Sequence, residues 1–285
     1  MALRYAYNTN GCANHRLYDA LDLIERAGYD GVALTLDWHH LDPFAEDWKR
    51  QTLKLRQRLR DGQLGCVIET GARYLLDPHQ KHEPTLLHPE IAGRNRRLEF
   101  LRRAVDIAAL LDAEAVSFWA GVRQPTVSKE DAWRWLHDGV SRLAEYAERS
   151  GVTLALEPEP GMQIELLSEY EQLRRSVGPS LRLALDVGHL WVTGEQLPEK
   201  AVCDYADQLG TVAIEGMDRG VHVHLPIGEG DMSLPPILAA LQSIDLKRLI
   251  CVELSRESPR AHLAIPQSIS RLKAMEKHLR TMVSG

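Results

Sequence analysis

The chain has 285 residues, and its 34 lysines and arginines against 40 aspartates and glutamates give a net charge of −6 at pH 7. This balance argues against nucleic acid or an anionic membrane surface as the partner, because both are polyanions that bind through basic patches. We therefore expect a small-molecule partner.

The N-terminal residues lack the basic segment and apolar stretch of a signal peptide, and no run approaches the roughly 18 apolar residues of a membrane span. We expect a cytoplasmic protein. The four cysteines, Cys12, Cys66, Cys203 and Cys251, are far apart and form no CxxC pair. This spacing indicates neither a zinc knuckle nor a disulfide framework.

Short apolar runs, each followed by a longer segment of helical periodicity, recur eight times along the chain. Segments 18–28, 96–113 and 131–151 show the clearest helical pattern. Strict alternation of strand and helix requires parallel strands, because each right-handed crossover returns the chain in the same direction. Eight such units predict one (β/α)8 TIM barrel domain over residues 1–285. The predicted strands are 3–8, 31–36, 64–69, 114–119, 152–157, 181–186, 220–225 and 249–254.

The connection between the third and fourth predicted strands breaks the regular spacing. Residues 70–91, TGARYLLDPHQKHEPTLLHPEI, form a long polar segment rich in histidine and proline. Long connections in compact domains are usually functional or disordered. Because this one follows the carboxyl end of a strand, we expect it to form a rim or lid over the active-site face.

Four successive predicted strands, the fifth to the eighth, carry a carboxylate or an imidazole at their carboxyl ends. These ends surround one pocket in a barrel, so the side chains are expected to converge. Two glutamates, an aspartate and a histidine around one point form a site for one divalent ion, either Mn²⁺, Mg²⁺, Co²⁺ or Zn²⁺. The residues are Glu157, Asp186, Glu253 and one of the histidines His222 and His224.

The choice between the two histidines rests on strand geometry. Side chains alternate between the two faces of a strand, so only one of His222 and His224 is expected to face the barrel interior. We assign His224 to the metal because it lies nearer the carboxyl end, and His222 to packing or a supporting role. His189, three residues after Asp186, is expected to reach the same point. A purely structural explanation is weak for the set, because converging buried charges without a cation repel each other.

With these residues the chain resembles the xylose isomerase-like TIM-barrel superfamily, which contains sugar and sugar-phosphate isomerases and epimerases. The resemblance covers essentially the whole chain and also implies self-association into a homo-oligomer. It implies one metal ion, with His189 beside it contacting a substrate oxygen and with Glu157 and Glu253 as the acid–base pair. The motifs are LALEPEPG with Glu157, LALDVGHL with Asp186 and His189, HVHLPIGEGD with His224, and CVELSRES with Glu253, and the implied metal ligands are Glu157, Asp186, His224 and Glu253.

The implied activity is that of a metal-dependent isomerase or epimerase of a small sugar or sugar-like polyol carbonyl compound. An ion that grips a carbonyl and the adjacent hydroxyl stabilises the cis-enediolate formed when the carbon between them loses a proton. One group must remove that proton and another return it from the opposite side, so Glu157 and Glu253 are expected almost to face each other across the ring. The alternatives are a dehydratase of the inosose or dehydroshikimate type on the same scaffold, and a metal-free binding barrel.

Two departures separate the chain from named branches of the superfamily. In the ketose 3-epimerases an arginine follows the strand-seven histidine by six positions, whereas Gly230 stands there in this chain. The endonuclease IV branch uses three zinc ions and further histidines, and HLPIGEGDM offers no second Asp-x-His. Together with the acidic charge balance, this disfavours a nuclease.

Four further residues are predicted to contact the substrate, and each also has a structural explanation. Trp119 ends the fourth strand, where an aromatic wall against a sugar or a bulky core side chain is expected. Arg73 suits a substrate carboxylate or phosphate, or else a surface ion pair. His39 either lines the pocket or lies in a solvated loop. Arg256, three residues after Glu253, either reaches the substrate or forms an ion pair.

Overall fold

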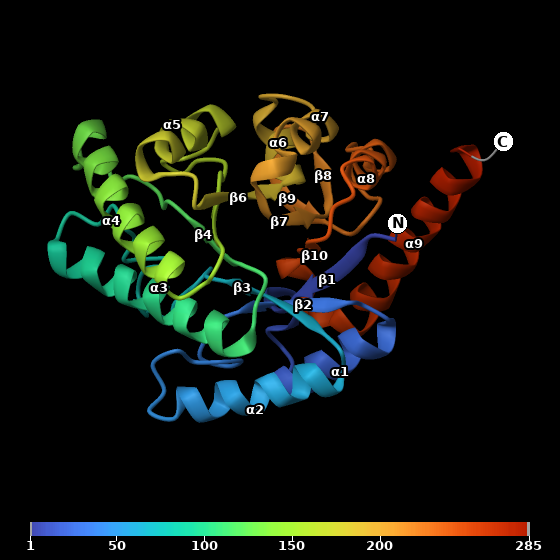
Figure 1. The fold of residues 1–285 in the computed structure, drawn as a ribbon, viewed down its shortest axis with the longest axis horizontal. Coiled ribbons are helices and arrows are strands. Elements are labelled where there is room, and N and C mark those ends of the chain that lie inside the picture. The colour runs from blue at the N-terminus through green and yellow to red at the C-terminus, as the bar shows by residue number, and fades with distance from the viewer. Residues whose placement is uncertain (1, 284–285) are drawn as a thin grey trace.

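Eight parallel strands close into a barrel in the computed structural model, which describes residues 2–283 (Figure 1). Around the ring the strands follow the order β1, β10, β7, β6, β5, β4, β3, β2, and β1 closes the ring against β10. The predicted (β/α)8 fold is thereby confirmed. The barrel strands are β1 (Arg4–Asn8), β2 (Gly31–Thr35), β3 (Gly65–Glu69), β4 (Val116–Trp119), β5 (Leu154–Glu157), β6 (Leu181–Asp186), β7 (Leu209–Ile214) and β10 (Leu249–Val252).

The barrel strands are apolar along most of their length because helices cover their outer face while the barrel encloses the inner one. β2, β4 and β5 are buried at every position. Most of their outward side chains join those of the helices in one large apolar core. All four cysteines are free, and Cys12, Cys66 and Cys251 are buried, so they contribute as small apolar residues.

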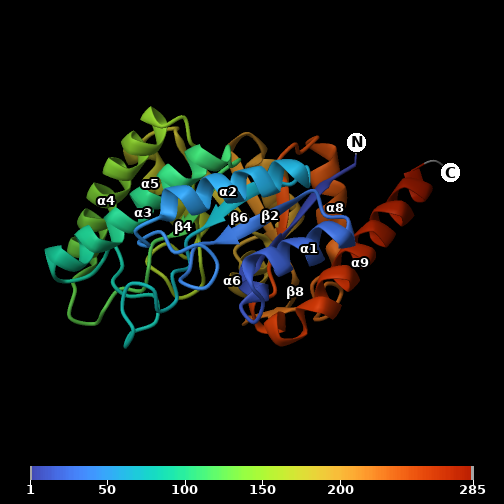
Figure 2. The ribbon, with the colours of Figure 1, turned by 90° about the horizontal axis from the view of Figure 1, so that it is seen from below.

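Helices surround the barrel, and the first of them packs against the last (Figures 1 and 2). The first, α1, ends at Gly28, whose φ of 85° places it in the left-handed region that favours glycine. The fourth, α4, begins after Ser128, whose side chain accepts a hydrogen bond from the Asp131 backbone. The helices are α1 (Leu17–Ala27), α2 (Trp48–Asp61), α3 (Ile91–Leu111), α4 (Lys129–Arg149), α5 (Leu167–Val177), α6 (Val187–Thr193), α7 (Pro198–Asp204), α8 (Leu234–Ser243) and α9 (Ala261–Val283), with short 3-10 helices at Thr9–Cys12, Ala206–Gln208 and Ser255–Arg260.

The prediction of the seventh barrel strand was wrong. The barrel strand is β7, whereas the predicted segment 220–225 forms β9 (Val221–Leu225), which pairs antiparallel with β8 (Gly216–Asp218) outside the barrel. Every residue of β9 is exposed or half-buried, while β7 is buried at five of its six positions. Its alternating valines and histidines therefore belong to a half-solvated antiparallel hairpin and not to a barrel strand.

The long connection after β3 is present and runs from residue 70 to residue 90. Thr85, Leu86 and Leu87 are buried and anchor it against the body of the protein. Further toward its N-terminal end, Arg73 and His82 line the pocket at the carboxyl ends of the strands. The segment thus contributes to the rim of that pocket, as predicted.

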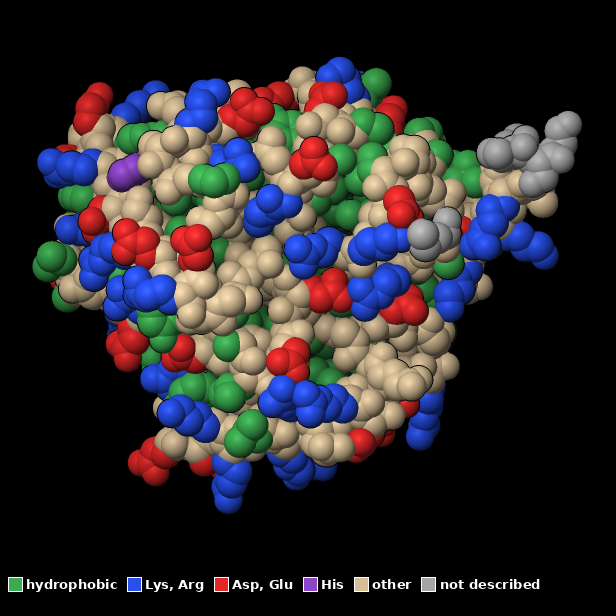
Figure 3. All heavy atoms as spheres, viewed as in Figure 1, with side chains coloured by type: hydrophobic (Ala, Val, Ile, Leu, Met, Phe, Trp, Pro, Cys, Tyr) green, Lys and Arg blue, Asp and Glu red, His purple; other side chains and the backbone are tan. Residues whose placement is uncertain are grey.

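Charged side chains of both signs are mixed over the face of the molecule shown in Figure 3. No large patch of a single sign covers that face, in keeping with the weak electrostatic footprint expected from the net charge. Within residues 2–283, none of the helices has both the length and the apolar character that crossing a membrane requires.

Candidate active site

Carboxylates from five strands gather at the carboxyl end of the barrel. Glu157 and Asp186 are the last residues of β5 and β6, and both are buried. Glu69 ends β3, and Glu253 comes directly after β10. Glu215 directly follows β7 and has no exposed surface. Parallel strands bring these ends together, so the acids occupy one region although they are far apart in the sequence.

Glu215 was missed in the sequence. Its position carries a usable signal, because Glu157, Asp186 and Glu215 follow each other at intervals of 29 residues, one β/α repeat (186 − 157 and 215 − 186). Both oxygens of Glu215 and Oδ2 of Asp186 are buried and receive no hydrogen bond from a donor group among the described residues. Buried anionic oxygens without donors need a cation or a proton as partner.

Three histidines complete the site, and both His222 and His224 reach it, although strand alternation predicted that only one would. His189 Nδ1 lies 3.1 Å from the Pro158 carbonyl oxygen and donates to it, which leaves Nε2 as the acceptor of the ring. His222 Nε2 lies 3.0 Å from that nitrogen, so His222 faces the site instead of packing away from it. The His224 ring centroid is 5.5 Å from that of His222, and His224 Nδ1 lies 4.0 Å from Glu215 Oε2. Both histidines reach the site because they come from a hairpin over the barrel mouth and not from a barrel strand.

The electrostatics of this region reflect burial first and the crowding of like charges second. Burial, and then the charge of Asp186, raise the pKa of Glu215. Burial acts against ionisation of Asp186, but the neighbouring His189 and His224 outweigh it and lower the pKa of Asp186. Burial lowers the pKa of His189 to about 4, so its ring is neutral near pH 7 and can act as a metal ligand.

Three sets of side chains bring their ligand atoms close enough to share a metal ion. In each set the candidate ligand atoms lie within 4.8 Å of one another. Asp186, His189 and His224 each belong to two of the sets, so the sets form one connected cluster. Glu253 falls outside them, although it lines the same pocket. The sets are Glu157, Asp186 and His189; Asp186, Glu215 and His224; and His189, His222 and His224.

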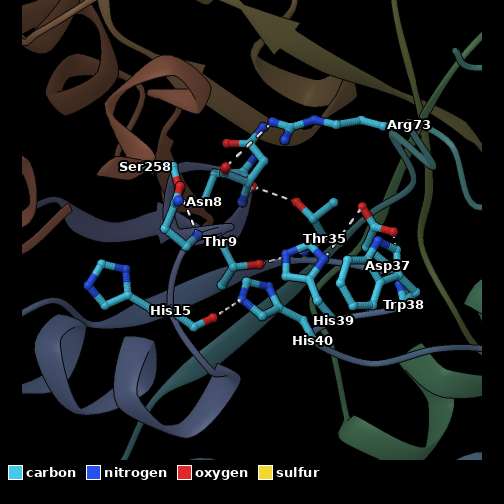
Figure 4. Close-up of polar contacts among 12 residues, drawn as sticks. Asn8, Thr9, His15, Thr35, Asp37, Trp38, His39, His40, Arg73 and Ser258 are labelled. Carbon is cyan, nitrogen blue, oxygen red and sulfur yellow. Dashed lines mark hydrogen bonds and ion pairs between the residues drawn. The ribbon is translucent and has the colours of Figure 1, made fainter. Parts of the chain in front are cut away.

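Two amides hold the carboxylate of Glu253. Asn10 Nδ2 donates to Oε1 at 2.8 Å and Asn8 Nδ2 to Oε2 at 3.3 Å. Asn8 is itself fixed by the Thr35 hydroxyl, which donates to Asn8 Oδ1 at 2.8 Å (Figure 4). β5 and β10 are three positions apart in the ring of eight, where four would be directly opposite. Glu157 and Glu253 therefore approach the pocket from nearly opposite sides, in keeping with the expectation that they almost face each other.

Four of the five predicted substrate contacts line the pocket, which has a volume of about 370 Å³. They are His189, Trp119, Arg73 and Arg256. His39 is not among the described residues that line it. Its ring lies beside His40, with centroids 4.2 Å apart, and its Nδ1 is 3.9 Å from Asp37 Oδ2 (Figure 4). The lining residues are Asn10, Thr35, Glu69, Gly71, Arg73, Lys81, His82, Trp119, Glu157, Glu159, His189, His222, Val223, His224, Glu253, Ser255 and Arg256.

Sequence comparisons point to one family and to one kind of relative. A family model described as xylose isomerase-like TIM barrel matches residues 21–275. The L-ribulose-5-phosphate 3-epimerase UlaE of Escherichia coli (strain SMS-3-5 / SECEC) is 24% identical over 218 residues, which cover 74% of this chain and 72% of the epimerase. The protein of the same name from Shigella flexneri matches at the same identity and coverage.

Solved structures share the fold along nearly the whole chain. A D-tagatose 3-epimerase-like protein has a TM-score of 0.76 at 19% identity, covering 99% of this chain and 100% of that one. An L-ribulose 3-epimerase has a TM-score of 0.76 at 18% identity, covering 99% and 97%. The IolI protein with a binding zinc atom has a TM-score of 0.74 at 18% identity, covering 97% and 98%. At these identities the likeness establishes the fold, whereas function depends on the site.

Proposed function

Because the chain belongs to the xylose isomerase-like TIM barrel family, we propose that it is a metal-dependent isomerase or epimerase of a small sugar or sugar-like carbonyl compound. The observation that carries the proposal is the set of buried oxygens of Asp186 and Glu215 that lack donors beside the unpartnered His224 Nδ1. Its curated relatives named as L-ribulose-5-phosphate 3-epimerases support the reaction class.

The residues fit one divalent ion. Asp186, Glu215 and His224 would hold it, since their ligand atoms lie within 4.8 Å of one another and are otherwise unsatisfied. Glu157 and Glu253 line the same pocket and would complete the coordination. Mixed carboxylate and imidazole ligands suit Mn²⁺, Co²⁺ or Zn²⁺, and Mg²⁺ less well. When bound, the ion supplies a Lewis acid for a carbonyl and the adjacent hydroxyl of the substrate.

Glu253 and Glu157 are proposed to transfer the proton. The two amide donors fix the carboxylate of Glu253 at the pocket, and we assign it the role of proton acceptor. Burial and the neighbouring Glu69 raise the pKa of Glu157, so it is the better proton donor. Glu253 would remove a proton from one carbon to give a cis-enediolate, and Glu157 would donate its own proton from another side. Donation to the same carbon would epimerise the substrate. Donation to the neighbouring carbon, with one proton moved between the two oxygens, would isomerise it.

His189 is proposed to orient the substrate and not to transfer the proton. Its Nδ1–H is held by the Pro158 carbonyl, and its Nε2 points toward His222 and Asp186. A ring that is neutral near pH 7 and contacts Pro158 through one nitrogen and His222 through the other keeps a fixed position against the substrate.

The test combines metal analysis with isotope exchange. Freshly purified protein should hold about one divalent ion per chain, and the Glu157→Gln, Asp186→Asn double variant should lose it. In deuterated water the wild type should incorporate deuterium into a ketose or ketose phosphate, and Glu253→Gln should not. Glu145→Gln, on the exposed face of α4, is the matched control.

Two results would decide against the proposal. The first is a protein that binds no ion after reconstitution with Mn²⁺, Co²⁺ or Zn²⁺. The second is deuterium incorporation that Glu253→Gln leaves unchanged. An α,β-unsaturated product would instead identify a dehydratase on this scaffold.

A further inference from the structure

One wall of the pocket combines two cations with two rings, and a third cation packs against one of these rings. Arg73 and Lys81 line the pocket from the segment after β3. Arg97, on α3, is 1% exposed, and its guanidinium carbon lies 4.2 Å from the centroid of the Trp119 ring. His82 lies near the same ring, with centroids 5.2 Å apart, so Trp119 is positioned between Arg97 and the pocket. We call Arg73, Lys81, His82, Arg97 and Trp119 the cationic wall.

The cations of this wall have no carboxylate partner. Among residues 2–283, neither Arg73, Lys81 nor Arg97 forms an ion pair within 4.0 Å, whereas Arg58 pairs with two acids on the surface. Arg73 donates one long hydrogen bond of 3.5 Å to the Asn10 carbonyl oxygen (Figure 4).

Arg97 is the most buried of the three. It donates to the Thr70 carbonyl oxygen at 3.0 Å, and its Nη1 has no partner. Glu83 is the acid whose charge acts on Arg97, but burial outweighs it and lowers the pKa of Arg97 to about 9. No carboxylate of the described residues lies close enough to form an ion pair with this buried cation, which makes its burial costly.

Backbone conformation holds the wall in place. Ala72 and His82 both have positive φ, 45° and 69°, a region that side-chain-bearing residues occupy only at a cost of about 1 kcal/mol or more. The His82 backbone N–H also donates to the Arg73 carbonyl oxygen at 2.6 Å. This hydrogen bond joins the two ends of the segment 73–82, so the backbone of Arg73 lies beside that of Lys81 and His82.

Burial and the positive charges of this wall lower the pKa of the His82 ring. Burial, followed by the charges of Lys81, Arg97 and Arg73, lowers the pKa of His82 to about 4. The ring is therefore neutral near pH 7 and adds a hydrogen-bonding group without adding charge. Arg256 lies on the other side of the pocket, close enough to His222 to contribute to lowering its pKa after burial and His224.

We propose that the substrate of this pocket is an anion, a sugar phosphate or a sugar acid, whose oxyanion binds Arg73 and Lys81 at the cationic wall. This inference rests on the proposed function, since it names the class of substrate that the same pocket takes. The carbonyl end of the substrate faces Asp186, Glu215 and Glu253, which would repel the oxyanion, so the two ends of the pocket impose one orientation. A planar guanidinium binds a phosphate or carboxylate with two parallel hydrogen bonds, and Lys81 adds a point charge.

The first test measures turnover by the full-length, metal-loaded protein. We compare kcat/KM for deuterium exchange on a ketopentose, its 5-phosphate and a ketose carboxylic acid. An anionic compound should be preferred, and the better of the two anions identifies the source of the oxyanion. Arg73→Gln should lower kcat/KM for that anion by about 10- to 100-fold, mostly through KM, and lower kcat/KM for the neutral ketose far less. Arg73→Lys should recover part of the loss, and Arg50→Gln on α2 should change nothing.

The second test needs no turnover. Inorganic phosphate bound at the cationic wall offsets the nearby positive charge, so it should raise the pKa of His82, followed by NMR, by about one pH unit. The Arg73→Gln, Lys81→Gln double variant should abolish that response. The inference is overturned if kcat/KM is equal for neutral and anionic ketoses and phosphate leaves the pKa of His82 unchanged. If phosphate raises the pKa of His82 but no carbonyl compound takes up deuterium, the anion site is supported and the proposed isomerase activity is refuted.

Discussion

Raising the pH of the metal-free protein from 6.5 to 8 is expected to destabilise it. Burial, followed by the charges of Glu253 and Asp186, raises the pKa of Glu159 from 4.5 to about 8. Between these values the folded state keeps a proton that the unfolded state has lost, so the free energy of unfolding falls as the pH rises. The histidines with lowered pKa act in the opposite sense, but only below about 6.5, because above it they are neutral in both states.

The magnitude follows from the width of that window. Each pH unit changes the free energy of unfolding by about 1.4 kcal/mol per group, so 1.5 units give about 2 kcal/mol for Glu159. This figure is an upper bound, because Glu159 is half-buried and water in the pocket screens its charge. For a domain of 285 residues, about 2 kcal/mol lowers the melting temperature by roughly 3 °C. Glu69, Glu157 and Glu215, whose pKa burial also raises, act in the same direction.

The assay is thermal unfolding followed by circular dichroism at pH 6.5, 7.2 and 8, with a chelator and again with saturating Mn²⁺. The ion should remove most of the pH dependence, because it stabilises the ionised carboxylates. Glu159→Gln should reduce the slope in the chelated protein, and Glu145→Gln should not. A melting temperature that stays constant or rises with pH in the chelated protein refutes the reasoning.

Three further predictions concern single contacts of the site. Glu215→Gln should lower the affinity for a divalent ion, measured by calorimetry, at least about tenfold. The same variant should raise the melting temperature of the metal-free protein at pH 8. An unchanged affinity would show that Glu215 is not a ligand. Gly188→Ala would place its Cβ 2.0 Å from Glu215 Oε1 and displace that carboxylate, so it should also lower the affinity for the divalent ion. Gly71→Ala, with nothing within 4 Å of its Cβ, should leave that affinity unchanged. Asn10→Ala removes the 2.8 Å donor to Glu253, so kcat should fall about tenfold at unchanged metal content, and a constant kcat would contradict the role of that amide.

The sequence predicted the barrel and the acids that end its strands because both depend on periodic features. Glu157 and Asp186 end continuous apolar runs one repeat apart, and this spacing places them on the same face of any β/α barrel. The same rule applied once more would have selected Glu215, which ends the apolar run 209–214. The segment 220–225 was predicted as the seventh strand because it is a short run rich in valine bounded by glycine and proline. In a barrel of parallel strands buried on both faces, however, continuous apolar runs are the relevant pattern.

The cationic wall could be predicted only in part. Arg73 was recognised because it lies just after a strand end, but Arg97 lies in the segment RNRRLEFLRR, where five arginines share one helix. Which of them is buried depends on how α3 rotates against β4, and this is decided by packing against Trp119. Helical periodicity assigns charged residues to the solvent face by default, so a buried arginine runs against the rule.

The β8–β9 hairpin divides the site between two parts of unequal stability. The carboxylates stand on a ring of eight strands, each held on both sides, whereas His222 and His224 stand on two short strands that pair only with each other and through one bridge from Met217 to Gly230. Backbone amides of the hairpin should therefore exchange with solvent long before those of the ring. The hairpin can open and move its histidines away from the site while the barrel stays folded. An ion that takes ligands from both parts is fully coordinated only when the hairpin is closed, so hairpin closure is one step of ion binding.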